Sequence, residues 1–194
     1  MADVLRLSFR FFSNLHLHGR DAIAPAERLF NASPARNACF LGNIGDPRTQ
    51  VYQQFLWATA KRYDRVFVVA GRCEYAGLSD GCKGIDKYLD DLCMTMGNCY
   101  YLQESAVRID QRLIVAGGTF RKGGQQNLLN ACREEYARER TITKGSGQTL
   151  LLSHHLFEMD KTGVKGSTHW VSPSSENEIF IDGHRVPSGF TLPF

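Results

Sequence analysis

Residues 38–47 read Ala-Cys-Phe-Leu-Gly-Asn-Ile-Gly-Asp-Pro, an apolar run followed at once by glycines, an asparagine and a proline. Four consecutive apolar residues that end at a glycine predict a short buried strand. Asp46 and Pro47 then predict the N-cap and the first position of a helix. A strand, a polar loop and a helix in this order are typical of α/β folds, which place their chemistry in such loops.

The segments around this unit continue the alternation of strands and helices. Apolar residues recur mostly at every second position in residues 4–12, which predicts a strand. The unbroken apolar run at residues 66–70 predicts a central strand covered on both faces, and helical spacing predicts helices over about residues 48–63 and 84–96. Turn signals between apolar runs predict two hairpins. The remaining predicted elements are a hairpin at residues 106–116, an exposed helix at 125–140, a buried strand at 149–152 and a hairpin at 178–186 with its turn at Asp182-Gly183.

Length and composition predict one α/β domain over residues 1–194, with two sheets packed face to face, helices outside and an apolar C-terminal tail at residues 186–194. An apolar fraction of 43% and a charged fraction of 22% are ordinary for a soluble globular protein. No apolar run approaches the ~20 residues that span a bilayer, and the first residues lack the pattern of a secretory signal. A net charge of +3 is too small to predict nucleic-acid binding.

The six cysteines form neither a C-x-x-C pair nor a regular disulfide framework. They therefore favour reduced thiols and a cytoplasmic location, in a reducing intracellular compartment, over a disulfide-bonded scaffold. The cysteines are Cys39, Cys73, Cys82, Cys93, Cys99 and Cys132.

Five short polar motifs each follow an apolar run. Strand ends followed by loops are where α/β folds place chemistry, so these motifs are the candidate site. They are Ser13-Asn14-Leu15-His16, Gly42-Asn43-Ile44-Gly45, Gly71-Arg72-Cys73-Glu74, Ser153-His154-His155 and Gly166-Ser167-Thr168-His169.

The order and context of the motifs resemble the calcineurin-like metallophosphoesterases over about residues 5–170. The resemblance implies a four-layer α/β/β/α sandwich with two packed mixed sheets, and a site for two adjacent divalent metals that activate a bridging water. It implies that His16, His154 and His169 are vestigial metal ligands. Five positions depart from the family pattern: Asn14 and Asn43 replace aspartates, Arg72 replaces the ligand asparagine, Cys73 replaces the catalytic histidine and Ser167 replaces a ligand histidine.

These departures remove negative charge from the implied metal site. Amides are weak ligands for hard divalent cations, and Arg72 adds a positive charge that repels a cation and can bind an anion. We therefore expect no catalytic residue among the five degenerate positions and no cofactor; a retained metal would be a single Zn or Mn. An inert Cys73 thiol is favoured over a nucleophile.

The function expected from the sequence is that of a pseudoenzyme, a catalytically inactive metallophosphoesterase-like domain. It would act as a structural or protein-interaction subunit whose partners are other protein subunits of an assembly. Two alternatives stay open. One is a residual one-metal phosphoesterase that uses His16, His154 and His169, and the other is a phosphate or nucleotide sensor that uses Arg72.

Overall fold

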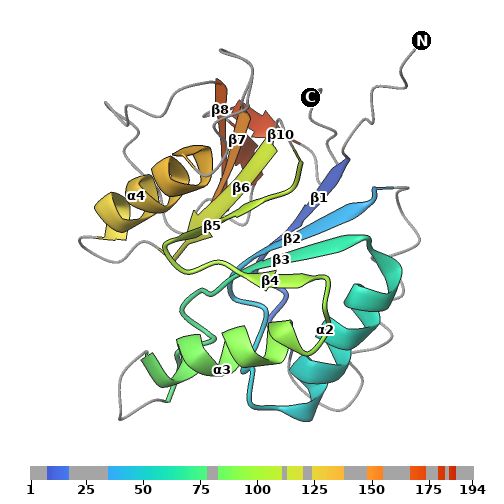
Figure 1. Cartoon of the computed structure of the whole chain (residues 1–194). Helices are drawn as coiled ribbons and strands as arrows, with labels where there is room; N and C mark the ends of the chain where they lie inside the picture. Colours follow the sequence, from blue (N-terminus) through green and yellow to red (C-terminus); the bar gives the residue numbers. More distant parts are fainter. Residues whose placement is uncertain are drawn as a thin grey trace.

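The computed structural model describes residues 8–17, 35–77, 83–110, 113–119, 124–137, 148–154, 167–173, 179–181 and 184–186. These residues form an α/β fold with two sheets and flanking helices (Figure 1). The strands are β1 (Phe9–Phe12), β2 (Asn37–Leu41), β3 (Arg65–Val69), β4 (Cys99–Tyr101), β5 (Ser105–Arg108), β6 (Leu113–Gly118), β7 (Gln148–Ser153), β8 (Ser167–Pro173), β9 (Ile179–Ile181) and β10 (His184–Val186), and the helices are α2 (Gln50–Arg62), α3 (Lys83–Met94) and α4 (Gly124–Ala137).

The first sheet has the strand order β1-β2-β3-β4, and its described strands are all parallel. Phe11 lies beside Cys39, and Cys39 lies beside Phe67. Strands covered on both faces carry apolar residues at every position, which explains the unbroken apolar runs of β2 and β3. Because the strands are parallel, their carboxyl ends share one edge of the sheet, and the loops that follow them begin there.

The second sheet has the order β10-β9-β8-β7-β6-β5 and is mixed. Strands β6, β7 and β8 are parallel, whereas β5 pairs antiparallel with β6, and β9 pairs antiparallel with β8 and β10. The two predicted hairpins are therefore confirmed as the β5–β6 and β9–β10 pairs. The prediction that both sheets are mixed is wrong for the first, whose described strands are all parallel.

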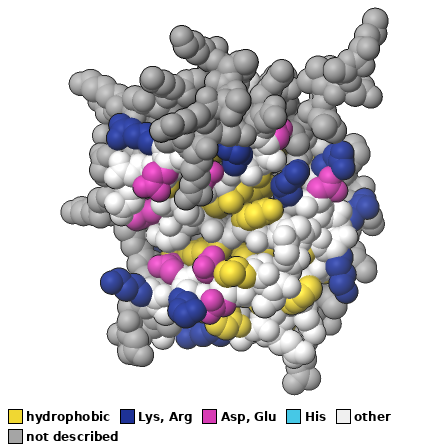
Figure 2. All heavy atoms as spheres, viewed as in Figure 1, with side chains coloured by type: hydrophobic (Ala, Val, Ile, Leu, Met, Phe, Trp, Pro, Cys, Tyr) yellow, Lys and Arg dark blue, Asp and Glu magenta, His cyan; other side chains and the backbone are white. Residues whose placement is uncertain are grey.

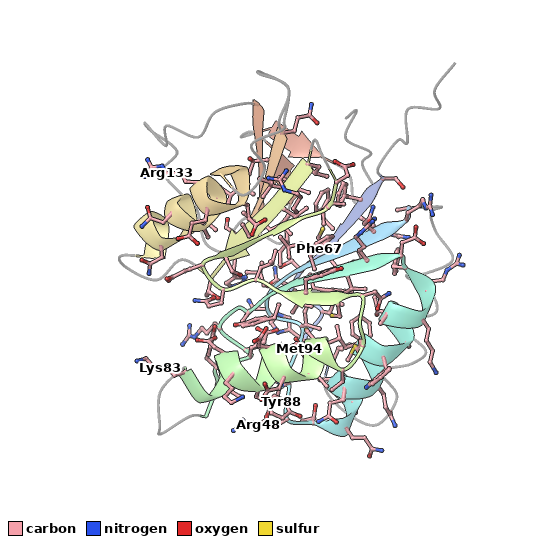
Figure 3. The ribbon with its side chains drawn as sticks, in the orientation of Figure 1. Arg48, Phe67, Lys83, Tyr88, Met94 and Arg133 are labelled. Carbon is pink, nitrogen blue, oxygen red and sulfur yellow. The ribbon has the colours of Figure 1, made fainter. Side chains whose placement is uncertain are left out.

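Three apolar clusters hold the layers together. The cluster between the sheets joins side chains of β1, β2 and β3 to side chains of β6 and β7, with Phe67 (labelled in Figure 3) fully buried in it. A second cluster packs the other face of the first sheet against α2 and α3. The third packs α4 against β6 and β7 through Leu128 and Cys132, which are one helical turn apart. Figure 1 shows α2 and α3 beside the first sheet and α4 beside the second.

Helix α2 begins later than the sequence predicts. Its N-cap is Thr49, whose hydroxyl accepts a hydrogen bond from the Tyr52 N–H at 3.3 Å. The carboxylate of Asp46, the predicted N-cap, instead accepts from the backbone N–H of Arg48 at 3.0 Å and from its guanidinium at 2.8 Å. The hydrogen bonds to Arg48 therefore stabilise the turn that precedes the helix, and the Asp46 carboxylate does not cap α2.

Two strands were not predicted. Strand β4 has three residues, too few for a periodic pattern, and it forms through its pairing with β3. Strand β8 begins at Ser167, so the last of the five motifs opens a strand and does not follow one. The predicted tail at residues 186–194 lies, apart from Val186, outside the described residues, as do Cys82, His155 and the turn at residues 182–183.

The surface carries charges of both signs. On the face shown in Figure 2, Lys and Arg side chains are interspersed with Asp and Glu side chains, and apolar side chains lie between them. This mixture agrees with the small net charge of the chain. Within the described residues, every helix is too short or too polar to cross a bilayer.

Candidate functional site

The loops that follow β1, β2 and β3 meet at the carboxyl edge of the first sheet. Backbone hydrogen bonds continue from β1 and β2 into the loops: the Asn14 N–H donates to the Gly42 carbonyl at 3.1 Å, and the His16 N–H donates to the Asn43 carbonyl at 3.0 Å. His154, directly after β7, reaches the same edge, because its Nδ1 lies 2.7 Å from the Leu41 carbonyl oxygen. Four segments far apart in sequence thus form one site.

The structure places six of the predicted site residues at this edge. Asn14, His16, Asn43, Arg72, Cys73 and His154 lie in the converging segments. Ser167 and His169 lie in β8, with His169 beside Leu150 of β7. Their side chains are outside the described part of the chain, so their roles stay predictions.

Two glycines make this convergence possible. A β-carbon on Gly42, whose φ is +84°, would lie 2.5 Å from His154 Nδ1 and 2.6 Å from the Gly71 nitrogen. A β-carbon on Gly71 would lie 2.6 Å from the Asn43 nitrogen. No side chain fits in these spaces without moving the backbone, which explains the glycine that opens each of these two motifs.

Glu74 holds the β2 and β3 loops together from below the site. Its carboxylate is buried and accepts hydrogen bonds from the backbone N–H groups of Ile44 and Gly71, both at 2.7 Å, and of Asn43 at 3.0 Å. A fourth donor, the Gly45 N–H, lies at 3.4 Å. Burial raises the pKa of Glu74, and the backbone donors oppose that effect. The sequence analysis assigned no role to Glu74. The feature that could have indicated one is an acidic residue in the glycine-containing loop after β3, close to the glycine-containing loop after β2, whose backbone N–H groups need an acceptor.

The two asparagines bind each other. Asn43 Nδ2 donates to Asn14 Oδ1 at 2.8 Å, and Asn43 Oδ1 accepts from the Cys73 N–H at 3.0 Å. Both amide oxygens therefore already accept hydrogen bonds from the protein. Within the described residues, Asn14 Nδ2 donates no hydrogen bond, so it is a donor that the site can offer to a ligand.

His154 is a buried neutral imidazole. A carbonyl oxygen only accepts hydrogen bonds, so the contact with Leu41 requires the proton to be on Nδ1 of the neutral ring. Burial lowers the pKa of His154, which keeps the ring neutral at pH 7. The lone pair is then on Nε2, the arrangement of a general base or a metal-binding imidazole.

Cys73 and His16 form a thiol–imidazole pair. The distance from Cys73 Sγ to His16 Nδ1 is 3.4 Å. Burial and the charge of Glu74 raise the pKa of the Cys73 thiol, whereas the positive charge of Arg72 lowers it. Arg72 itself is exposed and, within the described residues, makes no hydrogen bond or ion pair.

The backbone of the site is strained. Asn14, His16 and Asn43 have φ values of 55°, 47° and 56°, in the left-handed region that residues with a side chain seldom adopt. Glu104 is the fourth non-glycine residue with positive φ in the described segments. Such backbone angles cost free energy and are found mostly at functional sites, where they serve binding or catalysis.

The described residues do not fit a two-metal centre. No three His, Cys, Asp or Glu side chains among them are grouped closely enough to hold an ion. Two adjacent hard divalent cations are usually held by charged carboxylate oxygens, whereas the amide oxygens of Asn14 and Asn43 are neutral and accept hydrogen bonds from the protein. The donor set suits an anion better than a pair of cations.

The fold is similar to that of a solved hydrolase. No family model and no curated protein matches this chain. The crystal structure of phosphopantetheinyl hydrolase from Mycobacterium tuberculosis matches with a TM-score of 0.55 and 14% sequence identity, over 92% of this chain and 86% of that one. At this identity the likeness shows a shared fold.

The comparisons correct two predictions. Membership of the calcineurin-like metallophosphoesterases is not supported by any family model or curated protein, and a solved structure with a similar fold is described as a phosphopantetheinyl hydrolase. Motifs of three or four residues after strands are too short to identify a family, because many α/β folds place polar loops there. The pseudoenzyme prediction, which depended on that membership, is also corrected, because the solved structure with the similar fold is that of a hydrolase.

Proposed function

We propose that this chain is a hydrolase of phosphate esters with its active site at the carboxyl edge of the first sheet. The observation that carries the proposal is the convergence at that edge of the neutral imidazole of His154, the Cys73–His16 pair and the exposed guanidinium of Arg72. The hydrolase with the similar fold supports the reaction class, and its name supports a phosphate-containing substrate.

Arg72 supplies the affinity for an anion. A guanidinium presents paired N–H donors that match phosphate oxygens, and it stays charged at all physiological pH values. Asn14 Nδ2 is a further donor at the same edge. These groups bind the phosphoryl oxygens and stabilise the charge that develops on them during displacement.

His154 supplies general base catalysis. Its Nε2 lone pair accepts the proton of a water molecule that attacks phosphorus, while the Leu41 carbonyl holds the ring through Nδ1. The lowered pKa of His154 keeps this base unprotonated at pH 7.

An activity panel with matched variants tests the proposal. The purified chain would be assayed with p-nitrophenyl phosphate, bis(p-nitrophenyl) phosphate and 4′-phosphopantetheine, after EDTA treatment and again with added Zn²⁺ or Mn²⁺. Arg72→Ala should raise KM about tenfold or more, because a hydrogen bond to a charged group is worth about 1.5–3 kcal/mol. Arg133→Ala, on the exposed side of α4 (Figure 3), should leave KM unchanged.

Failure of the wild-type chain to hydrolyse all three esters, with and without metal, would refute the proposal. Activity that appears only with metal would favour the one-metal phosphoesterase that uses His16, His154 and His169. Thermal stabilisation by inorganic phosphate without hydrolysis, lost in Arg72→Ala, would favour a non-catalytic phosphate or nucleotide sensor. The sensor function is supported by Arg72, which has no ion pair within the described residues and can therefore bind a phosphate.

We further propose the finer architecture and setting expected from the sequence. The three apolar clusters support a four-layer α/β/β/α sandwich within a single domain. The five described cysteines are free thiols, which supports a reducing cytoplasmic compartment. Limited proteolysis tests the single domain, and a stable fragment shorter than the sandwich would contradict it. Protein partners remain a prediction, for which co-purification under native conditions is the test.

A further inference from the structure

We infer that Cys73 is the nucleophile of this site and that His16 accepts its proton, so that hydrolysis proceeds through a phosphocysteine intermediate. The inference rests on the proposed function and extends it, because it names the atom that attacks phosphorus. It also assigns a role to the thiol–imidazole pair at the edge, which general base catalysis by His154 does not use.

The contact between the two side chains is made by tertiary structure. Residues 16 and 73 are 57 positions apart, yet Sγ and Nδ1 are separated by 3.4 Å, within the range of a hydrogen bond that involves sulfur. A nucleophile within hydrogen-bonding reach of a base is the arrangement that activates a thiol. The backbone of Cys73 is fixed by its N–H, which donates to Asn43 Oδ1 at 3.0 Å.

His16 has a left-handed backbone conformation, which is uncommon for a residue other than glycine. Its φ of 47° is kept by backbone hydrogen bonds from His16 N to the Asn43 carbonyl at 3.0 Å and from Leu17 N to the Ile44 carbonyl at 2.7 Å. Glycine or asparagine would fit this backbone with less strain. The uncommon backbone angle of His16 is an observation separate from the thiol contact, and such angles cluster at functional sites.

The thiol needs a base in order to lose its proton. Burial and the charge of Glu74 raise the pKa of Cys73, and the positive charge of Arg72 offsets them only in part. Transfer of the Cys73 proton to His16 creates a thiolate–imidazolium pair, in which each charge stabilises the other. The positive charge of Arg72 acts on the Cys73 thiol, so a phosphate ester bound by Arg72 would lie near the attacking sulfur.

The reaction balances in two steps. In the first, His16 takes the thiol proton, sulfur attacks phosphorus, the P–S bond forms and the P–O bond to the alcohol breaks; the imidazolium returns the proton to the alkoxide. In the second, water attacks phosphorus while His154 takes one of its protons, the P–S bond breaks and the thiolate leaves. The proton on His154 returns to the thiolate through solvent, which regenerates the thiol and releases inorganic phosphate.

The other described cysteines cannot serve in this role. Cys39, Cys93, Cys99 and Cys132 are buried, and Cys93 and Cys99 lie 3.3 Å apart, sulfur to sulfur, inside the core beneath α3. Burial raises the pKa of Cys39 and Cys132, and the hydrogen bond with Cys93, together with burial, raises the pKa of Cys99. Their burial also keeps these thiols away from a substrate. Cys73 is the sole described cysteine with an accessible thiol.

The test traps the intermediate and follows the configuration at phosphorus. Wild-type protein would be quenched in denaturant during turnover of p-nitrophenyl phosphate and digested, and the phosphoryl group should be found on the peptide that contains Cys73. Cys73→Ala should abolish the adduct and lower kcat/KM by about 100-fold or more. Cys132→Ala is the matched control and should keep the adduct and the rate per folded molecule.

His16→Asn keeps a residue that tolerates the left-handed backbone and removes the base. It should lower kcat by about 100-fold, because general base catalysis contributes about 10²–10⁴-fold, and it should slow alkylation of Cys73 by iodoacetamide. An isotopically chiral phosphate ester, with its phosphoryl group passed to an alcohol acceptor, should show retention of configuration, since two displacements each invert phosphorus.

Inversion, or full activity in Cys73→Ala, would overturn this inference and leave the proposed hydrolase with direct attack by water. Absence of hydrolysis in the wild-type chain would overturn both. Melting temperatures of all variants separate lost chemistry from lost folding.

Discussion

Glu74→Gln is the substitution that most sharply tests how the site is built. One carboxylate oxygen accepts from Ile44 and Gly45, and the other accepts from Gly71 and Asn43. Glutamine keeps a single acceptor oxygen and turns the other position into an N–H₂ donor. Whichever way the amide is oriented, it directs donors at two backbone N–H groups and leaves those groups without an acceptor.

The magnitude follows from the bonds that are lost. Two charge-assisted hydrogen bonds at about 1.5–3 kcal/mol each give about 3–6 kcal/mol. Burial of the carboxylate offsets part of this, because desolvation raises the pKa of Glu74 and so disfavours its charged form. We expect a net loss of about 3 kcal/mol in the free energy of unfolding, which lowers Tm by about 6–12 °C for a chain of this length.

The assay is thermal and urea unfolding of wild-type, Glu74→Gln and Glu134→Gln proteins at pH 7. Glu134 is exposed on α4, so its variant should remain within about 0.5 kcal/mol of wild type. Equal stability of Glu74→Gln and wild type would refute the conclusion that this carboxylate holds the β2 and β3 loops together. An equal loss in both variants would show that charge alone, and not the hydrogen bonds, matters.

Three further predictions concern packing and pH. Gly71→Ala should destabilise by about 3 kcal/mol or more, since its β-carbon would lie 2.6 Å from a neighbouring backbone nitrogen, whereas Gly84→Ala, with open space around it, should be neutral or stabilising by about 0.4–1 kcal/mol in urea unfolding. Burial lowers the pKa of His154 in the folded state below 6.5, so its contribution to stability is fully present above pH 6.5 and is lost as the pH falls below that value. In His154→Gln, the fall of Tm below pH 6.5 should therefore be smaller than in the wild type. An unchanged dependence of Tm on pH would contradict the neutral imidazole. Phe67→Ala should cost about 3–5 kcal/mol, because the ring fills the layer between the sheets, whereas Met94→Ala, at a side chain 72% exposed, should change stability by less than about 0.5 kcal/mol; similar losses in both would argue against that core.

Local pattern was sufficient to predict most elements of the fold. The apolar runs of β2, β3 and β7 and the periodic residues of α3 predict their own structure, because a strand buried on both faces or a helix with one buried side needs that composition whatever its neighbours are. Strand β4 and the opening of β8 could not be predicted, since pairing with β3 and β7 is what makes these short segments extended. The N-cap of α2 was missed for a similar reason: the two candidates, Asp46 and Thr49, differ only in which partner each side chain finds.

The same division applies to the site. The polar residues that follow β1, β2, β3 and β7 were identified from the sequence, since parallel strands place their carboxyl ends at one edge. The acceptor role of Glu74, the proton position on His154 and the contact between His16 and Cys73 depend on strand register and on backbone angles. A shift of one residue in either sheet would exchange the faces and separate these groups. Composition and periodicity thus determine which segments become strands and helices, whereas only the tertiary structure decides which side chains meet, because a distance of a few ångströms between residues 57 or more positions apart has no local cause.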